Sequence, residues 1–512
     1  MQLTSYLDKG ASLDASAPCL TMGGDTRSYE EVQTFSYQCA RALAALGIAP
    51  GDKVAILSGN HPTAFSCVFG LARAGAVWCP VNPRNQAAEN ADLLNAADCR
   101  ALIFHSAFLP MVEKIKPIMP GVSVMICIDK QTEIAPSLEE ALEGYDHSPL
   151  QVDSPDDLAA MPGTGGTTGK PKLVQLTGRN IETMSALTLM GYPFGEHPVF
   201  AALAPLTHAA GILCFPILAS GGHIIILPSP DLDQFLAAIE THKVTHTFLP
   251  PTVIYMLLDH PKLDTTDLSS LECFWYGAAP ISVKRLEEAL TRIGPMAQLY
   301  GQTEAPMMIS MMSPADHLTS SGEIHRERLS SAGRVAPLVQ LEIQDGEGKE
   351  VNRGERGEIC VKGSLVMAGY YNNASANQEA FRDGWLRTGD IGYLDEEHFL
   401  YIVDRAKDMV ITGGFNVYSV EVENAIRDHP SVQECAVIGL PDDKWGERVV
   451  AVVIPRADQK IDKAELVTHT KAKIGSVKAP KQVEVWQDLP RSRVGKVNKQ
   501  TVRGMLLKGE FL

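Results

Sequence analysis

Residues 164–172, with the sequence TGGTTGKPK, are of types that suit the binding of phosphate groups. Three glycines let the backbone bend sharply and approach a ligand closely. Threonine hydroxyls and backbone amides can bond phosphate oxygens, and two lysines add positive charge. A Walker loop is excluded, because that motif needs glycine where Thr164 stands and a hydroxyl residue where Pro171 stands. The segment therefore predicts a different phosphate-binding loop. Its candidate residues are Thr164, Gly165, Gly166, Thr167, Thr168, Gly169 and Lys172.

Four later segments carry charged residues that phosphate chemistry needs. They are YGQTE at 300–304, WLRTGD at 385–390, DRAKD at 404–408 and PRSRVGK at 490–496. Carboxylate oxygen, as in Glu304, is a hard ligand of the kind that magnesium prefers. Taken singly, these segments have ordinary interpretations: an isolated glutamate or lysine is a solvated charge, and a Gly-Asp pair is a turn. The order and combination of the segments favour a shared chemical role.

In that combination the segments resemble the motifs of the adenylate-forming superfamily. This superfamily includes acyl- and aryl-CoA synthetases, luciferases and the adenylation domains of peptide synthetases. The motifs occur in the expected order, and the resemblance covers roughly residues 25–500. The resemblance implies an enzyme that uses ATP and Mg²⁺ to convert a carboxylic acid into an acyl-adenylate. It further implies that the acyl group passes to CoA, with release of AMP and pyrophosphate.

The resemblance assigns roles around the adenine and the phosphates. Tyr300 would stack on adenine, Thr303 would bond the α-phosphate, and Glu304 would hold magnesium. The segment YGAAP at 276–280 resembles the loop on the adenine side of the site. The remaining candidates of this group are Gly277, Ala278, Ala279 and Gly301.

Further roles fall on the C-terminal segments. Asp390 would accept both ribose hydroxyls, because one carboxylate has two oxygens to offer. Arg405 would contact ribose or phosphate, and Lys407 stands where the family has its hinge residue. Lys496 would bridge the substrate carboxylate and the α-phosphate, where a cation offsets the repulsion between two anions.

The segment PLTHAAG at 205–211 resembles the border of the acyl pocket. His208 would lie near the carboxylate or gate the pocket, although a structural histidine is the alternative interpretation. Methionine suits an adaptable pocket wall, and ordinary core packing explains it equally well. No acidic residue of this motif would hold an α-amino group, so we favour a fatty or aryl acid over an α-amino acid. The candidate pocket residues are His208, Ala209, Leu299, Met307 and Met308.

For CoA, the segment GGFNV at 413–417 resembles the loop that lines the pantetheine tunnel. Gly413 and Gly414 would allow close approach of the thin pantetheine arm, and Trp445 lies where related ligases contact CoA. Lys478 and Lys481 are candidates for the CoA phosphates.

Five positions differ from the pattern of the family. They are Gly165, Leu173, Gly178, Ala278 and Val477. We expect altered handling of ATP or CoA at most, because the threonines and charged residues of the motifs remain.

The helices and strands that must position these residues predict an α/β fold. Apolar strands are expected at 54–57, 77–79, 102–104 and 124–128, with a helix at 62–74 after the first of them. Such alternation predicts layered, mainly parallel sheets. By resemblance, residues 1–403 form a large N-terminal domain of doubly wound-like subdomains plus a small β-barrel. Residues 404–408 would be a hinge, and 409–512 a smaller mobile α+β domain.

The composition of the chain limits the kinds of molecule that it is expected to bind. The formal charge of −16 disfavours a nucleic-acid or anionic-membrane binder, since both need a basic face. The ten cysteines are scattered singly, which indicates reduced, mostly buried thiols. The charge-free stretch 197–230 is interrupted by prolines and glycines, so it reads as core and not as a membrane span. With no signal-like N-terminus, we expect a cytoplasmic protein that takes a small-molecule acid; its oligomeric state is open.

Two alternatives remain at this point. One is an adenylating enzyme that passes its acyl group to a carrier-protein thiol or to oxygen. The other is a nucleotide-binding regulatory protein with an inactive site, which the retained Glu304, Asp390, Arg405 and Lys496 disfavour.

Overall fold

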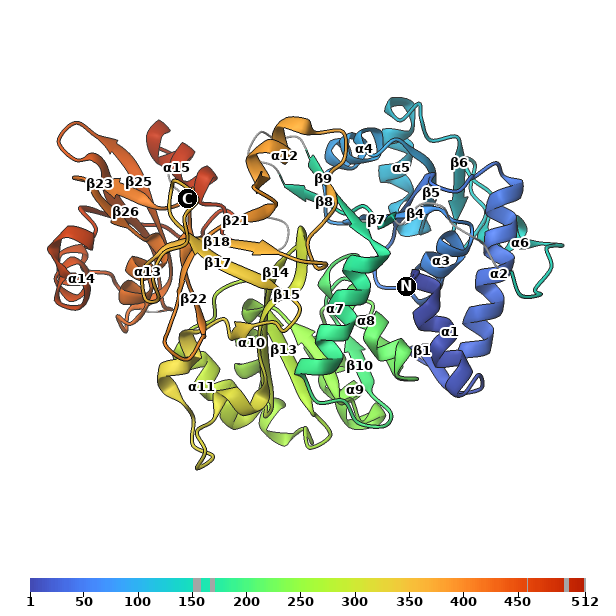
Figure 1. The fold of residues 1–512 in the computed structure, drawn as a ribbon, viewed down its shortest axis with the longest axis horizontal. Coiled ribbons are helices and arrows are strands. Elements are labelled where there is room, and N and C mark those ends of the chain that lie inside the picture. The colour runs from blue at the N-terminus through green and yellow to red at the C-terminus, as the bar shows by residue number, and fades with distance from the viewer. Residues whose placement is uncertain (151–157, 166–170, 458, 492–496, 511–512) are drawn as a thin grey trace. The chain divides into compact units, whose positions relative to one another are not determined.

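The computed structural model describes residues 1–150, 158–165, 171–457, 459–491 and 497–510. Its chain forms two compact units (Figure 1). Unit 1 comprises Met1–Gln340 and Val361–Leu386, and unit 2 comprises Leu341–Cys360 and Arg387–Leu512. The expected hinge at 404–408 concerns a movement of the chain, so it stays a prediction.

Unit 1 contains a mixed sheet in the order β16-β15-β14-β13-β12-β10-β11-β1-β2. The strands from β14 to β11 along this order run parallel, whereas β15 is antiparallel to β14. The strands are β1 (Pro18–Met22), β2 (Asp25–Ser28), β10 (Val199–Ala202), β11 (His223–Ile226), β12 (His246–Leu249), β13 (Cys273–Gly277), β14 (Met296–Gln302), β15 (Ala305–Met312) and β16 (Arg334–Val335).

A second sheet of unit 1 has the order β19-β9-β7-β4-β3-β5-β6, with β8 paired to β9. The strands expected at 54–57, 77–79, 102–104 and 124–128 all form here, and they are parallel and apolar as predicted. Burial on both faces explains their nearly continuous hydrophobic sequence. The strands are β3 (Lys53–Leu57), β4 (Val77–Val81), β5 (Cys99–Phe104), β6 (Val124–Cys127), β7 (Leu158–Ala160), β8 (Gly163–Gly165), β9 (Pro171–Thr177) and β19 (Gly369–Tyr370).

Helices of unit 1 pack on one another through aromatic side chains. Figure 1 shows α7 (Gly178–Gly191), α8 (Ala209–Ala219) and α1 (Leu3–Leu13) side by side. Phe215 of α8 contacts Tyr6 of α1 and both Phe65 and Phe69 of α3 (Pro62–Arg73), with ring centroids 5.2–6.4 Å apart. Buried aromatic rings of this kind contribute strongly to core stability.

Unit 2 has its own sheet, in the order β24-β23-β26-β25 with β27 paired to β26. Its members are β23 (Val410–Thr412), β24 (Phe415–Val417), β25 (Val432–Asp442), β26 (Gly446–Pro455) and β27 (Gln482–Val485). The helices α13 (Ser419–Arg427), α14 (Lys463–Lys478) and α15 (Lys499–Lys508) belong to the same unit. A further small sheet includes β17 (Gln340–Gln344), β18 (Gly357–Lys362), β21 (Trp385–Leu394) and β22 (Leu400–Arg405).

Two expectations about composition agree with the fold. All ten cysteines lie among the described residues, and there they are free and buried. Within the described part of the chain, no helix is both long and apolar enough to cross a bilayer.

A largely buried group of charges connects β22, α13 and α15 in unit 2. The Lys499 Nζ atom lies 2.7 Å from Glu423 Oε1 and donates to Ser419 Oγ at 2.6 Å. The Ser419 hydroxyl in turn donates to Asp404. Burial alone would lower the pKa of Lys499, but the carboxylates of Glu423 and Asp404 hold it above its ordinary value. Burial raises the pKa of Asp404.

Replacing Lys499 with methionine is expected to destabilise unit 2 by about 3–5 kcal/mol, because it leaves buried carboxylates without their cation. Urea unfolding measures the loss. The exposed pair Lys463–Glu484 provides a control, since Lys463→Met should cost about 1 kcal/mol or less. Equal, small effects of both substitutions would show that Lys499 does not hold unit 2 together.

Candidate functional site

The predicted ligand-binding residues of unit 1 gather at one edge of its first sheet. Strands β10, β12, β13 and β14 are parallel, so their carboxyl ends lie at the same edge. His208 follows β10, Gly277 ends β13, and Tyr300 and Gly301 lie near the end of β14. Ligands of parallel α/β sheets bind outside this edge. The fold thus brings the acyl-side and adenine-side candidates to a common place.

At that edge the backbones of β13, β14 and β15 approach each other closely. A side chain at Gly277 would bring its Cβ to 2.4 Å from the Leu299 carbonyl oxygen, and at Gly301 to 2.3 Å from the Met307 amide. Such contacts require glycine, because the opposing atoms belong to the backbone. Ala278 and Met307 adopt left-handed conformations, with φ of 65° and 59°. Residues strained in this way often occur at ligand sites.

Glu304 is the centre of a contact between three distant segments. Its Oε1 accepts a hydrogen bond from the Tyr370 hydroxyl at 2.7 Å. The Lys172 ammonium lies 5.1 Å from the centre of the Tyr370 ring. Burial, and next the charge of Glu304, raise the pKa of Tyr370, so the phenol stays protonated as a donor. Lys172 of the phosphate segment and Glu304 of the YGQTE segment therefore meet through one tyrosine.

The predicted phosphate loop begins and ends as a hairpin. Strands β8 and β9 pair with Thr164 opposite Lys172 and Gly165 opposite Pro171. The predicted residues between them lie outside the described residues, as does Lys496. The predicted site residues outside the described part of the chain are Gly166, Thr167, Thr168, Gly169 and Lys496.

His208 precedes helix α8 and is partly buried. Its Nδ1 lies 2.9 Å from the Thr207 hydroxyl. Burial, and next the charge of Arg84, lower the pKa of His208, so its imidazole is neutral at pH 7. A neutral imidazole beside a carboxylate can form a hydrogen bond but supplies no positive charge. Ala209 begins helix α8 itself.

The loop that carries His208 is held by Asn60, which follows β3 in the other sheet. The Asn60 Nδ2 atom lies 3.0–3.2 Å from the carbonyl oxygens of Ala202, Ala204 and Leu227. Its Oδ1 accepts from the Leu206 amide at 2.8 Å. Asn60 thus binds main-chain groups on both sides of the loop's start and fixes the approach to His208.

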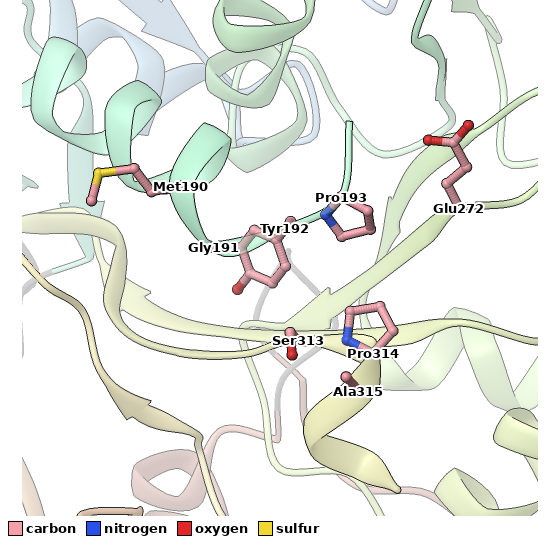
Figure 2. A pocket seen from close by; sticks show the side chains of 8 residues that line it. All are labelled: Met190, Gly191, Tyr192, Pro193, Glu272, Ser313, Pro314 and Ala315. Atoms are coloured by element: carbon pink, nitrogen blue, oxygen red, sulfur yellow. The ribbon is translucent and has the colours of Figure 1, made fainter. Parts of the chain in front are cut away.

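The apolar pocket candidates lie in the core beside this edge. Leu299 and Met308 are fully buried, Met307 nearly so, and Leu299 faces Gly277 and Met311 on the adjacent strands. An open pocket of about 340 Å³ lies elsewhere, lined by residues that include Tyr192, Glu272 and Pro314 (Figure 2). Glu272 precedes β13 whereas Gly277 ends it, so this pocket is at the opposite end of the strand. It contains none of the predicted site residues.

Unit 2 brings the predicted ribose residues together. Asp390 on β21 faces Arg405 on β22, and Arg405 Nε lies 2.6 Å from Asp390 Oδ1. The Asp390 side chain is almost completely buried, whereas Arg405 is exposed. Lys407 is exposed in the turn after β22. The pair therefore joins a buried carboxylate to an exposed guanidinium.

The predicted CoA residues also meet in unit 2. Gly413 and Gly414 form the turn between β23 and β24, with φ of 57° and 81°. The Gly413 amide donates to the Trp445 carbonyl oxygen at 2.7 Å, and a Cβ on Gly413 would lie 2.9 Å from the Trp445 ring. Lys478 pairs with Glu421, and Lys481 donates to the Ser476 carbonyl oxygen.

Sequence reasoning missed three residues that organise these sites: Asn60, Tyr370 and Lys499. Tyr370 and Lys499 carry no distinctive local pattern. Asn60 had a usable signal, because it comes shortly after the end of β3 at Leu57, and polar residues soon after a buried strand commonly lie at the ligand edge of a parallel sheet.

Because Ala278 pays the steric cost of a left-handed conformation, Ala278→Gly should raise the free energy of unfolding by about 0.5–1 kcal/mol. Thermal unfolding checks this. The neighbouring Ala279 does not have positive φ, so Ala279→Gly should instead lower stability. Stabilisation by neither substitution would show that the strain at Ala278 is negligible.

Comparison with known proteins identifies the family. The model of the AMP-binding enzyme family matches residues 7–371, and that of the AMP-binding enzyme C-terminal domain matches 421–496. The medium/long-chain-fatty-acid–CoA ligase FadD8 of Mycobacterium tuberculosis is 37% identical, over 96% of this chain and 88% of its own. The indoleacetate–CoA ligase of Aromatoleum aromaticum is 32% identical, over 100% of this chain and 99% of its own.

A solved structure shows the same fold. The amide bond synthetase McbA from Marinactinospora thermotolerans superposes with a TM-score of 0.89 at 29% identity, covering 98% of this chain and 99% of McbA. The mixed α/β architecture, with a larger N-terminal and a smaller C-terminal domain, is that of adenylate-forming enzymes. The chain therefore belongs to the AMP-binding enzyme family, the adenylate-forming superfamily, and within it to the acyl- and aryl-CoA synthetase branch.

Proposed function

We propose that this enzyme joins a fatty or aryl acid to CoA at the expense of ATP, through an acyl-adenylate. The observation that carries the proposal is the meeting of Lys172 and Glu304 at Tyr370. A cation from the predicted phosphate loop and a buried carboxylate from the predicted magnesium motif occupy one site in unit 1. An ATP-dependent acyl activation needs both groups near the phosphates.

The residues at this site fit magnesium. Among the described residues no cluster of three or more His, Cys, Asp or Glu could form a complete metal cage. Magnesium commonly binds through one or two carboxylates together with substrate phosphates, and Glu304 can supply such a carboxylate. Its Oε1 is occupied by Tyr370, and among the described residues nothing hydrogen-bonds to its Oε2. When bound, magnesium would offset the charge of the departing pyrophosphate.

In the first step the acid's carboxylate attacks the α-phosphorus of ATP, and the bond to pyrophosphate breaks. Tyr300 would stack on adenine, with Gly277, Ala278, Ala279 and Gly301 around it. Thr303 and Lys496 would bond the α-phosphate, while Thr164 and Lys172 hold the outer phosphates. Neutral His208 would orient the carboxylate by a hydrogen bond, which leaves the acid its nucleophilic charge.

In the second step the CoA thiol attacks the acyl carbon, and AMP leaves. A rotation of the C-terminal domain about Lys407 would withdraw Lys496 and present the Gly413–Gly414 turn with Trp445 to the pantetheine arm. Asp390 would hold the ribose hydroxyls, with Arg405 beside it. The two glycines with positive φ suit this role, because they keep side chains away from a narrow ligand path.

The names of the relatives support an acid without an α-amino group, because FadD8 is a ligase of fatty acids and the second relative a ligase of indoleacetate. Leu299, Met307 and Met308 would provide the apolar wall. The likeness to an amide bond synthetase supports one alternative in which a different nucleophile accepts the acyl group from the same adenylate. A carrier-protein thiol belongs to the same alternative.

The function is tested by measuring AMP and pyrophosphate release across a panel of fatty and aryl acids. We expect AMP formation to need both acid and CoA, and Lys496→Ala to slow acyl-adenylate formation by about 100-fold or more, as loss of one stabilising group typically does. Each acid is also offered with a carrier protein or an amine in place of CoA. Faster turnover with a carrier protein or an amine would show that this acceptor, and not CoA, takes the acyl group. Undiminished adenylation by Lys496→Ala would refute the role of that lysine.

Trp445→Ala is expected to raise the KM for CoA roughly three- to tenfold, since one aromatic contact contributes about 0.5–1.5 kcal/mol. The rate of ATP–pyrophosphate exchange, which reports adenylation alone, should not change. Leu507→Ala removes another exposed apolar side chain of unit 2 and serves as the control. A fall in exchange rate with no change in KM for CoA would contradict this assignment of Trp445.

A further inference from the structure

The geometry points to Tyr370 as the positioning residue that aims the Glu304 carboxylate at the metal and keeps it separate from Lys172. This inference rests on the proposed function, in which Glu304 binds magnesium and Lys172 binds phosphate. Tyr370 lies outside all the motifs that the sequence singles out.

The hydrogen bond between the two side chains fixes one carboxylate oxygen only. Glu304 is 9% exposed and Tyr370 is 7% exposed, so little water competes for this bond. The Tyr370 hydroxyl donates to Oε1 at 2.7 Å, and nothing among the described residues bonds to Oε2. A carboxylate held at one oxygen has its plane restricted and its other oxygen directed. Hydrogen bonds behind a metal ligand act in this way in many metal sites.

Tyr370 is itself held firmly. Asn377 of α12 (Ala374–Ala380) accepts from the Tyr370 amide at 2.7 Å and donates to its carbonyl oxygen at 3.0 Å. Tyr370 also pairs with Val174 of β9, the strand that contains Lys172. On the other side, the Met367 amide donates to the Glu304 carbonyl oxygen at 2.8 Å. Hydrogen bonds to the main chain of Tyr370 therefore hold its phenol in position without any contribution from a ligand.

The ring of Tyr370 also separates two opposite charges. Lys172 Nζ lies 5.1 Å from the ring centre, within the range of a cation–π interaction. No ion pair joins Lys172 to Glu304 among the described residues. A direct pair would neutralise both groups, whereas contact through the ring leaves the ammonium for phosphate and the carboxylate for the metal.

The test is Tyr370→Phe, which removes the hydroxyl and keeps the ring under Lys172. Binding of α,β-methylene-ATP is measured by calorimetry, once with Mg²⁺ and once with EDTA. We expect the Mg²⁺-dependent affinity to fall by about 10-fold, as is typical when a group behind a metal ligand is lost. Affinity in EDTA should not change. Tyr371→Phe is the matched control, because that hydroxyl bonds Asp98 and should affect neither measurement.

Glu304→Gln separates the failure of this inference from the failure of the proposed function. If Glu304→Gln leaves the Mg²⁺-dependent affinity unchanged, Glu304 is not the metal ligand, and the magnesium assignment of the proposed function fails. If Glu304→Gln weakens it and Tyr370→Phe does not, only the inference about Tyr370 is overturned. An equal loss of affinity with Mg²⁺ and with EDTA in Tyr370→Phe would also overturn it, because that pattern indicates a purely structural role.

Discussion

The loop that carries His208 depends on a single side chain that connects two sheets of unit 1. Asn60 follows β3, yet its amide binds main-chain groups at the end of β10 and after β10 and β11. Buried backbone groups must find partners, and at the irregular start of the loop to His208 no strand can supply them. One amide with donors and an acceptor satisfies both kinds of group. The His208 loop therefore has a defined course without secondary structure of its own.

The edge that Asn60 helps to define is also closely packed. Gly277 and Gly301 have no room for a Cβ, and Ala278 and Met307 adopt conformations that favour glycine. Short strands with closely approaching backbones place main-chain atoms, and not side chains, at the ligand edge. Such an arrangement would suit the proposed binding of a flat adenine ring beside Tyr300.

Two groups of charged side chains, one in each unit, are arranged differently. In unit 2, Lys499 and Glu423 are paired directly and buried, so their charges are used up within the fold. In unit 1, Lys172 and Glu304 are kept apart by the Tyr370 ring. Removing one partner of a buried direct pair is costly, because the other charge is left without compensation. Separation at the Tyr370 ring would instead leave both charges for the proposed ligands. The direct pair of Asp390 and Arg405 in unit 2 differs from Lys499–Glu423, because the Arg405 side chain is exposed.

The sequence by itself determined the class of chemistry and most local elements. The strands 54–57, 77–79, 102–104 and 124–128 could be predicted, because apolar runs are local properties. The ligand-binding roles of the phosphate segment at 164–172 and of the YGQTE segment stay predictions. Resemblance to the family also predicted that Asp390 and Arg405 bind near the ribose, and the fold places the two side chains in contact.

Only the tertiary structure decided which residues hold those motifs in place. Tyr370 and Glu304 are 66 residues apart, Lys499 and Ser419 are 80 apart, and Asn60 and Leu206 are 146 apart. A hydrogen bond between such distant segments leaves no periodicity or spacing in the sequence. It exists because sheets and helices pack so that a donor and an acceptor meet in a buried place, where each would be costly without the other.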